Sequence, residues 1–288
     1  MEQGLLPSPR VRFGPDYLRR VGGLVGRLAG VTERREGRGH SALYGSGEEF
    51  VGYRPYREGE SLAALDWNLL ARLDQPFVRV SKREASESWA ILLDTSASMG
   101  VGTPGKLQCA AEVAAGLCAV GLRGSATITL WSSSDTERMQ VDRTHGVSSA
   151  MQWLESKQAQ GEAGLEALLA KARLAGAGRV FLIGDFFDVD PASIARIQRR
   201  GRELVFLRIL SEDELVPAQR EAVEWIDPES GESRRMRVDR QAQADYELEL
   251  SHNLEAWRAF ASRHRISSGC WSSRVPFEDI VNSALAPS

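Results

Sequence analysis

Cysteine is scarce in this chain of 288 residues, which contains only Cys109, Cys118 and Cys270. Their spacing contains no pairs, which argues against both a disulfide framework and a zinc site. Such cysteine usage favours a reducing cytoplasm. Long apolar runs are also lacking, so we expect no segment that spans a membrane. The amino terminus lacks the apolar core of a secretory signal.

An excess of positive charge is missing too. The net charge is -3 and the pI is near 5.9, so the chain has no general attraction to a phosphate backbone. Nucleic acid is therefore not expected as a partner. The four histidines share no spacing with cysteines or acids, and no serine lies in a nucleophile elbow. The sequence thus gives no support to a histidine-based metal site or a serine hydrolase.

Charge is uneven, however, because the first forty residues contain eight arginines and four acidic residues. We interpret residues 1–36 as a basic amino-terminal arm. Within it Tyr17, Val21, Leu24 and Leu28 recur at helical spacing and predict an amphipathic helix. Such a helix either makes a peripheral contact with an anionic membrane or an acidic partner, or packs on its own domain. The second outcome is the more common one.

The rest of the chain divides at about residue 87. Residues 37–86 mix glycines, aromatics and charges, and indicate an extension of loops and short strands. Residues 87–288 alternate apolar strands with helices. This predicts an α/β domain with a doubly wound, mostly parallel sheet and helices on both faces. The predicted strands are 89–93, 126–131, 179–183, 203–210 and 265–271, with a hairpin at 222–226 and 235–238 and helices at 106–122, 192–200, 241–264 and after Pro276.

One carboxylate and two hydroxyls follow the first strand of this domain at alternate positions, Asp94, Ser96 and Ser98. After a buried parallel strand the chain turns toward a helix, so these side chains can converge above the carboxyl edge of the sheet. Oxygen ligands of this kind suit Mg²⁺ or Mn²⁺. The alternative is a helix N-cap, in which Ser96 or Ser98 accepts from free amides of the next helix.

A second acidic group, Asp185, follows a later strand and is predicted to lie at the same sheet edge as Asp94. The two carboxylates could then share one cation. The alternative is a turn in which Asp188 or Asp190 caps the next helix, with Pro191 near its start. The sequence leaves both interpretations of Asp185 open and assigns Asp188 to the turn.

Residues 100–106 match the glycine and lysine spacing of a phosphate-binding loop, but Leu107 stands where a magnesium-binding Ser or Thr is needed. Pro104 also removes one amide from the phosphate cradle. We interpret the match as accidental. Lys106 is expected to be an exposed residue in the first turn of the following helix.

Taken together, residues 94–98 and Asp185 resemble a von Willebrand factor A domain with a metal-ion-dependent adhesion site. Further segments resemble the bacterial domain of unknown function 58 family, from about residue 40 to the carboxyl end. These segments are 45–50, 54–59, 65–67, 71–72, 227–231 and Tyr246. The resemblance implies a von Willebrand factor A-like fold. In that fold Asp94, Ser96 and Ser98 would hold the ion and Asp185 would orient its waters.

Two departures from the family pattern weaken this expectation. The adhesion site expects a threonine in a glycine-containing loop, and Ala163 stands there, so one hydroxyl ligand is missing. Water can replace a neutral ligand on magnesium, so we expect weakened occupancy rather than none. The family also has an acidic pair after Gly59 and an arginine two residues before Leu65. Here Glu60-Ser61 and Ala63 stand at those positions.

The resemblance implies a non-enzymatic, cation-dependent adaptor that works with a MoxR-type AAA+ ATPase and its client in protein maturation or remodelling. An ion held by few protein ligands keeps an open position that a partner carboxylate can fill. One alternative is a magnesium-dependent phosphohydrolase of the haloacid dehalogenase type with Asp94 as nucleophile, which needs a second aspartate where Ser96 stands. Another is a vestigial, metal-free interaction domain.

Overall fold

The computed structural model describes residues 10–39, 43–45, 49–56, 66–73, 75–83, 87–135, 137–141, 144, 146–199, 201–216, 220–226, 228 and 232–286. It contains two compact units, one formed by Met1–Ala29 with Glu87–Ser288 and the other by Gly30–Ser86. Several residues of the family pattern lie outside the described residues, namely 46–48, 57–65, 227 and 229–231.

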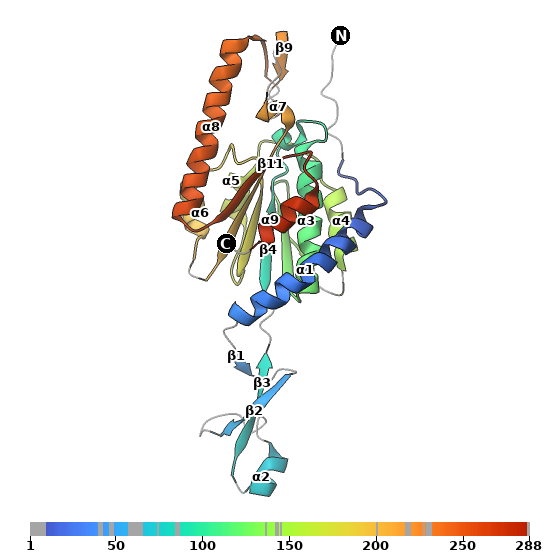
Figure 1. Cartoon of the computed structure of the whole chain (residues 1–288), viewed down its shortest axis with the longest axis vertical. Helices are drawn as coiled ribbons and strands as arrows, with labels where there is room; N and C mark the ends of the chain where they lie inside the picture. Colours follow the sequence, from blue (N-terminus) through green and yellow to red (C-terminus); the bar gives the residue numbers. More distant parts are fainter. Residues whose placement is uncertain are drawn as a thin grey trace. The chain divides into compact units, whose positions relative to one another are not determined.

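A six-stranded sheet forms the centre of the first unit, in the order β11-β8-β7-β4-β5-β6 (Figure 1). Its strands run parallel, except that β6 pairs antiparallel with β5 at one edge. The prediction of an α/β unit with a mostly parallel sheet is therefore confirmed. The strands are β4 (Ser88–Leu93), β5 (Thr127–Ser132), β6 (Met139–Val141), β7 (Arg179–Gly184), β8 (Glu203–Leu210) and β11 (Ser267–Ser272).

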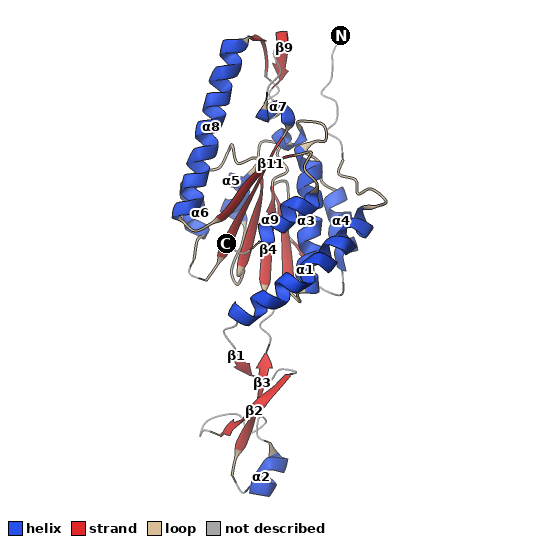
Figure 2. Cartoon of the chain, viewed as in Figure 1, coloured by secondary structure: helices blue, strands red, loops and turns tan. Residues whose placement is uncertain are grey.

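Helices pack against this sheet through two apolar layers (Figure 2). Alternate residues of a strand point to opposite faces, so Ile91 and Leu93 join one layer and Ala90 and Leu92 join the other. The first layer includes residues of α3, α4 and α9, and the second includes residues of α5, α6 and α8. The helices are α3 (Lys106–Arg123), α4 (Gly146–Glu155), α5 (Leu165–Lys171), α6 (Pro191–Ile197), α7 (Glu212–Leu215), α8 (Arg240–Arg263) and α9 (Phe277–Leu285).

The predicted amphipathic helix is α1 (Tyr17–Gly39), and its apolar stripe is buried. Tyr17, Val21, Leu24 and Leu28 all belong to the apolar layer that contains α3 and α9. The stripe therefore packs on the first unit, which is the more common of the two outcomes considered from the sequence. Among the described residues, no helix combines the length and the apolar character needed to cross a membrane.

Two smaller sheets complete the described structure. The second unit contains an antiparallel sheet in the order β1-β3-β2, made of β1 (Leu43–Gly45), β2 (Glu49–Pro55) and β3 (Phe77–Arg83), together with α2 (Trp67–Leu73). In the first unit, β9 (Arg220–Ile226) and β10 (Ser233–Val238) pair as the predicted antiparallel hairpin. The predicted last strand also joins the sheet edge, since β11 pairs with β8.

Candidate functional site

Asp94 follows β4 directly and is 1% exposed. Its Oδ1 accepts hydrogen bonds from the Ser96 amide at 2.9 Å and the Ser96 hydroxyl at 2.8 Å, and lies 3.5 Å from the Ser133 hydroxyl. Its other oxygen, Oδ2, is buried and has no hydrogen-bond partner among the described residues. Burial, reinforced by the charge of Asp185, raises the pKa of Asp94 to about 7.

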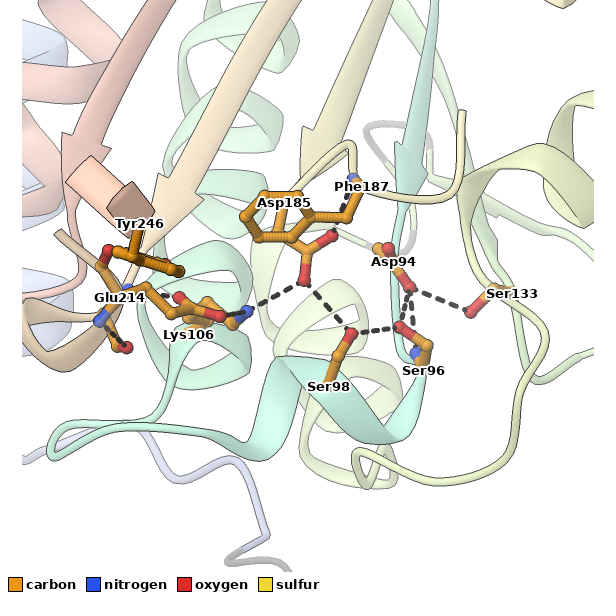
Figure 3. A network of polar contacts seen from close by, with 10 residues as sticks. Asp94, Ser96, Ser98, Lys106, Ser133, Asp185, Phe187, Glu214 and Tyr246 are labelled. Carbon is orange, nitrogen blue, oxygen red and sulfur yellow. Dashed lines mark hydrogen bonds and ion pairs between the residues drawn. The ribbon is translucent and has the colours of Figure 1, made fainter. Parts of the chain in front are cut away.

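The two serines link Asp94 to the second acidic residue (Figure 3). The hydroxyls of Ser96 and Ser98 are 3.0 Å apart, and the Ser98 hydroxyl donates to Asp185 Oδ2 at 3.1 Å. Ser96 precedes the short 3-10 helix η2 (Ala97–Gly100), but its side chain makes no capping hydrogen bond there. The N-cap alternative is therefore wrong for Ser96, because its hydroxyl is committed to the Asp94 carboxylate.

Asp185 follows β7, the neighbour of β4 in the sheet, and is 2% exposed. Parallel neighbours end at the same edge, so the turns after β4 and β7 bring Asp94 and Asp185 together. Asp185 Oδ1 accepts from the Phe187 amide at 3.2 Å, which fixes the orientation of the carboxylate. The structure thus gathers the four residues that the sequence singled out, Asp94, Ser96, Ser98 and Asp185, in one polar network.

Phe186, the residue between Asp185 and Phe187, adopts a left-handed backbone conformation with φ of 62°. This conformation is costly for a bulky residue and occurs where the surroundings enforce it. Here the Phe186 ring is buried against Phe206 and Trp257, at centroid distances of 5.3 Å and 5.6 Å. Aromatic packing on one face of the sheet therefore holds the turn that presents Asp185.

The expectation that Lys106 is exposed is wrong. Its side chain is completely buried, and Nζ donates to Asp185 Oδ2 at 2.8 Å and to Glu214 Oε1 at 2.5 Å (Figure 3). The cation lies at the start of α3, below the same sheet edge, where the two carboxylates replace water as its partners. Sequence analysis missed Glu214, which lies in α7 and also completes the capping box begun by Ser211.

The turn after Asp185 brings a third carboxylate near the site. One oxygen each of Asp94, Asp185 and Asp188 lies within 4.8 Å of the others, and Asp188 is exposed. Asp188 Oδ2 accepts from the Glu166 amide at 3.0 Å, whereas Asp190 caps α6 through the Ala192 amide. The predicted cap is therefore confirmed for Asp190. Asp188, which the sequence assigned to the same turn, instead accepts from the Glu166 amide and lies near the two buried carboxylates.

The loop around Ala163 lies beside this group. The Gly161 carbonyl accepts from the Ala97 amide at 2.9 Å, which ties the loop to η2. An added Cβ at Gly164 would lie 2.4 Å from Asp188 Oδ2, so the loop and the acidic turn are in close contact. The loop therefore lies beside the acidic cluster, but Ala163 has no hydroxyl to offer.

The donor set fits a hard cation with a reduced number of protein ligands. Carboxylate and hydroxyl oxygens are the ligands that Mg²⁺ and Mn²⁺ accept, and both ions keep several waters. Asp94 Oδ2 has no hydrogen-bond partner among the described residues and is therefore available to ligate an ion. A buried polar atom without a partner costs free energy, and a bound ion would remove that cost. Lys106 disfavours binding of a cation, because its ammonium already neutralises part of the charge of Asp185.

Fold and site define an α/β protein with a buried cluster of carboxylates and hydroxyls at the carboxyl edge of a mostly parallel sheet. The chain belongs to the family described as "Protein of unknown function DUF58", whose sequence profile matches residues 52–255. No curated protein matches the chain.

Solved structures also match. One is the conserved hypothetical protein BatB from Bacteroides thetaiotaomicron, at 13% identity and a TM-score of 0.37, covering 70% of this chain and 100% of that one. Another is an aerotolerance-related membrane protein from Bacteroides fragilis NCTC 9343 that carries multiple mutations to serine. It is 14% identical with a TM-score of 0.37, and the match covers 69% of this chain and 98% of that one.

Proposed function

We propose that this protein is a non-enzymatic protein-binding module with a von Willebrand factor A-like domain. Its site binds Mg²⁺ or Mn²⁺, and a carboxylate of the partner completes the coordination of the ion. The unpartnered Asp94 Oδ2 carries this proposal. A buried oxygen without a hydrogen bond needs a ligand, and a cation beside two serine hydroxyls is the ligand whose chemistry matches.

The roles follow from the hydrogen bonds that the four side chains make. Asp94, Ser96 and Ser98 would ligate it, and Asp185, already held by the Phe187 amide, would orient its waters. Because Ala163 offers no hydroxyl, one more position is left to water or to a partner. A partner carboxylate is favoured there, since it adds the negative charge that Lys106 removes from Asp185.

For the partner, we propose a MoxR-type AAA+ ATPase and its client in protein maturation or remodelling. Family membership and the resemblance in the sequence support this choice. The cysteine usage supports a cytoplasmic location. The direct test is capture of the purified ATPase by the full chain. We expect capture in Mg²⁺, and its loss in a chelator and in Asp94→Ala. Equal capture under all three conditions would contradict the proposal.

Thermal unfolding with and without Mg²⁺ or Mn²⁺ tests the cation itself. At a free ion concentration 100 times the dissociation constant, binding adds about 2.7 kcal/mol to the unfolding free energy of the wild type. Asp94→Ala should abolish this gain. Asp190→Ala is the matched control: it removes a helix cap in the neighbouring turn and lowers stability by about 1 kcal/mol, but keeps the ion-dependent gain. A gain that survives Asp94→Ala would exclude this site as its source.

One observation is also compatible with a phosphohydrolase. The oxygens of Asp94, Asp185 and Asp188 lie close together near Lys106, as a phosphohydrolase of the haloacid dehalogenase type requires. Ser96, however, cannot act as its general acid. Magnesium-dependent release of phosphate from an aryl phosphate, lost in Asp94→Ala, would establish that activity.

The resident ammonium of Lys106 favours the second alternative, a metal-free interaction domain. In that case neither Mg²⁺ nor Mn²⁺ would change the unfolding midpoint of the wild type, whereas capture of the partner would persist in a chelator.

A further inference from the structure

Arg208 is a buried cation in β8, and it takes no part in the site described above. It is 4% exposed, and the strand around it, residues 204–210, is otherwise apolar. Its Nη1 donates to Asn253 Oδ1 of α8 at 2.6 Å. Its Nε and Nη2 are buried and have no hydrogen-bond partner in the described structure. These two nitrogens form the side-on fork with which arginine binds a carboxylate.

A cavity of about 190 Å³ lies next to Arg208, between α8 and the β8 and β11 end of the sheet. Its walls are largely aromatic, because Phe186, Phe206 and Trp257 pack together at centroid distances of 5.3–5.9 Å. Arg208 and Cys270, which are register partners on β8 and β11, also border the cavity. The exposed residues Arg258 and Ser268 lie at its rim.

The charge of this cavity is of one sign. Arg208 and Arg258 line it, and none of its described lining residues is acidic. Neither arginine forms an ion pair with any described acid. An unsatisfied buried guanidinium is costly, and in native proteins such groups are usually paired. The cavity thus combines an unfilled positive recognition group with apolar walls.

We propose that this cavity binds a small carboxylate with an apolar, preferably aromatic, body. The carboxylate oxygens accept from Nε and Nη2 of Arg208, and the body packs against Phe186, Phe206 and Trp257. The volume holds about six waters at ~30 Å³ each, which matches one side-chain-sized group and is too small for a nucleotide.

A carboxylate fits better than a phosphate for a physical reason. The buried fork offers two donors, which satisfy the two oxygens of a carboxylate. A phosphate would bring a further charged oxygen among aromatic walls, where desolvation of an unpaired charge is costly. None of the residues assigned to the ion lines the cavity, although the charge of Asp185 acts on the Arg208 guanidinium.

Cys270 provides a readout at the cavity itself. Burial raises the pKa of all three thiols, to about 12 for the buried Cys109 and Cys118, but only Cys270 is partly exposed to a reagent. Iodoacetamide at mildly alkaline pH should therefore label Cys270 selectively, as located by mass spectrometry. We expect benzoate and phenylacetate to slow this labelling in a saturable manner, and benzamide to have no effect. Equal protection by the neutral amide, or no protection by either acid, would overturn the proposal.

Variants of the full chain test the roles of the residues. Arg208→Lys keeps the charge but loses the fork, and should weaken benzoate binding about tenfold in calorimetry, the value of one hydrogen bond to a charged group. Ser268→Phe fills the cavity from its exposed rim and should abolish binding. Arg263→Ala removes an exposed arginine of α8 outside the cavity and should leave affinity unchanged.

The unfolding midpoint of each variant reports whether it folds. If Arg208→Lys does not fold, Ser268→Phe still tests the proposal. Benzoate binding that survives in Ser268→Phe would overturn the assignment to this cavity. The peptide Gly-Gly-Phe with a free carboxyl end, compared with its amide, distinguishes the sources of the ligand. Binding of the free peptide identifies a chain terminus as the ligand, whereas binding of the acids alone identifies a small metabolite.

Discussion

Asp94 and Arg208 are buried groups of opposite charge near the carboxyl end of the same sheet, and each has polar atoms without a hydrogen-bond partner in the described structure. Their surroundings differ. Asp94 Oδ2 follows β4 and lies among hydroxyls and carboxylates. Arg208 lies on β8, next to a cavity with aromatic walls. A polar shell suits an ion that keeps its waters, and an apolar shell suits an organic anion that leaves water behind. The surroundings, rather than the missing hydrogen bonds, therefore define the class of ligand.

A third buried charge, that of Lys106, has its hydrogen-bonding and charge requirements met by partners in the protein. Lys106 has no exposed surface and bonds to both Asp185 and Glu214. It joins the turn after β7 to α7, so the ion pair crosslinks elements far apart in the sequence. Breaking this satisfied pair should therefore cost more free energy of unfolding than altering either unsatisfied group.

The largest effect is expected for Lys106→Met. The substitution keeps most of the side-chain volume but leaves Asp185 and Glu214 without their buried cation. We expect the unfolding free energy to fall by about 3–5 kcal/mol, as for other buried pairs that lose one partner. Denaturant unfolding measures the change. Added Mg²⁺ should restore part of the loss, because the site becomes more negative without the ammonium.

Lys157→Met is the control for this prediction. Lys157 is also mostly buried, but it pairs with the single, partly exposed carboxylate of Asp135. Its loss should therefore cost clearly less than that of Lys106. If the two substitutions had equal effects, the second carboxylate would contribute nothing, and the contrast between satisfied and unsatisfied charges would fail.

Most of the sheet could be predicted from the sequence, because its strands are apolar runs separated by helices of adequate length. The prediction of 203–210 coincides with β8, and that of 106–122 differs from α3 by one residue. The elements β6, α4 and α5 were not predicted. They are short, with three, ten and seven residues, and α5 begins at Leu165 after Gly164, which has no side chain to cap it. Their order depends on tertiary packing, which periodicity does not report.

Only those parts of the candidate site were predictable whose positions follow from the order and direction of the strands. Asp94 and Asp185 follow parallel neighbouring strands, so their proximity follows from the fold. The burial of Lys106 does not, because its partners lie 79 and 108 positions away in the sequence. A lysine in a first helical turn looks the same in sequence whether it faces water or two carboxylates. For Arg208, one charge inside an apolar strand was the available signal.

An intermediate effect is expected for Gly184→Ala, which crowds the turn on the cation side. The added Cβ would lie 2.7 Å from Leu165 Cδ1 and 2.8 Å from Asp94 Cβ. We expect a loss of about 1–3 kcal/mol, as for other overpacked cores, and a smaller ion-dependent gain in the unfolding midpoint. Gly178→Ala is the matched control, since its Cβ would meet only the Ser88 carbonyl at an ordinary 3.8 Å. Equal losses would show that crowding beside Asp94 is not the cause.

The smallest effect on stability is expected for Phe187→Ala, which lies between the two regions. Phe187 is half exposed, and its ring centroid is 4.7 Å from the Arg208 guanidinium carbon and 5.9 Å from Lys106 Nζ. Cation–π contacts of this kind contribute about 0.5–1 kcal/mol at exposed sites, and more where the cation is desolvated. We therefore expect the unfolding free energy to fall by about 1 kcal/mol.

A double-mutant cycle separates the two contacts of this ring. Phe187→Leu keeps apolar contact and removes the π face, so its pairing with Arg208→Met or Lys106→Met, which remove the cations, measures each cation–π term. The shorter distance predicts the larger coupling energy with Arg208. Coupling to Lys106 alone would make Phe187 part of the cation site. Coupling mainly to Arg208 would instead show that the ring separates the cation site from the carboxylate site. Each site could then be changed by mutation without affecting the other.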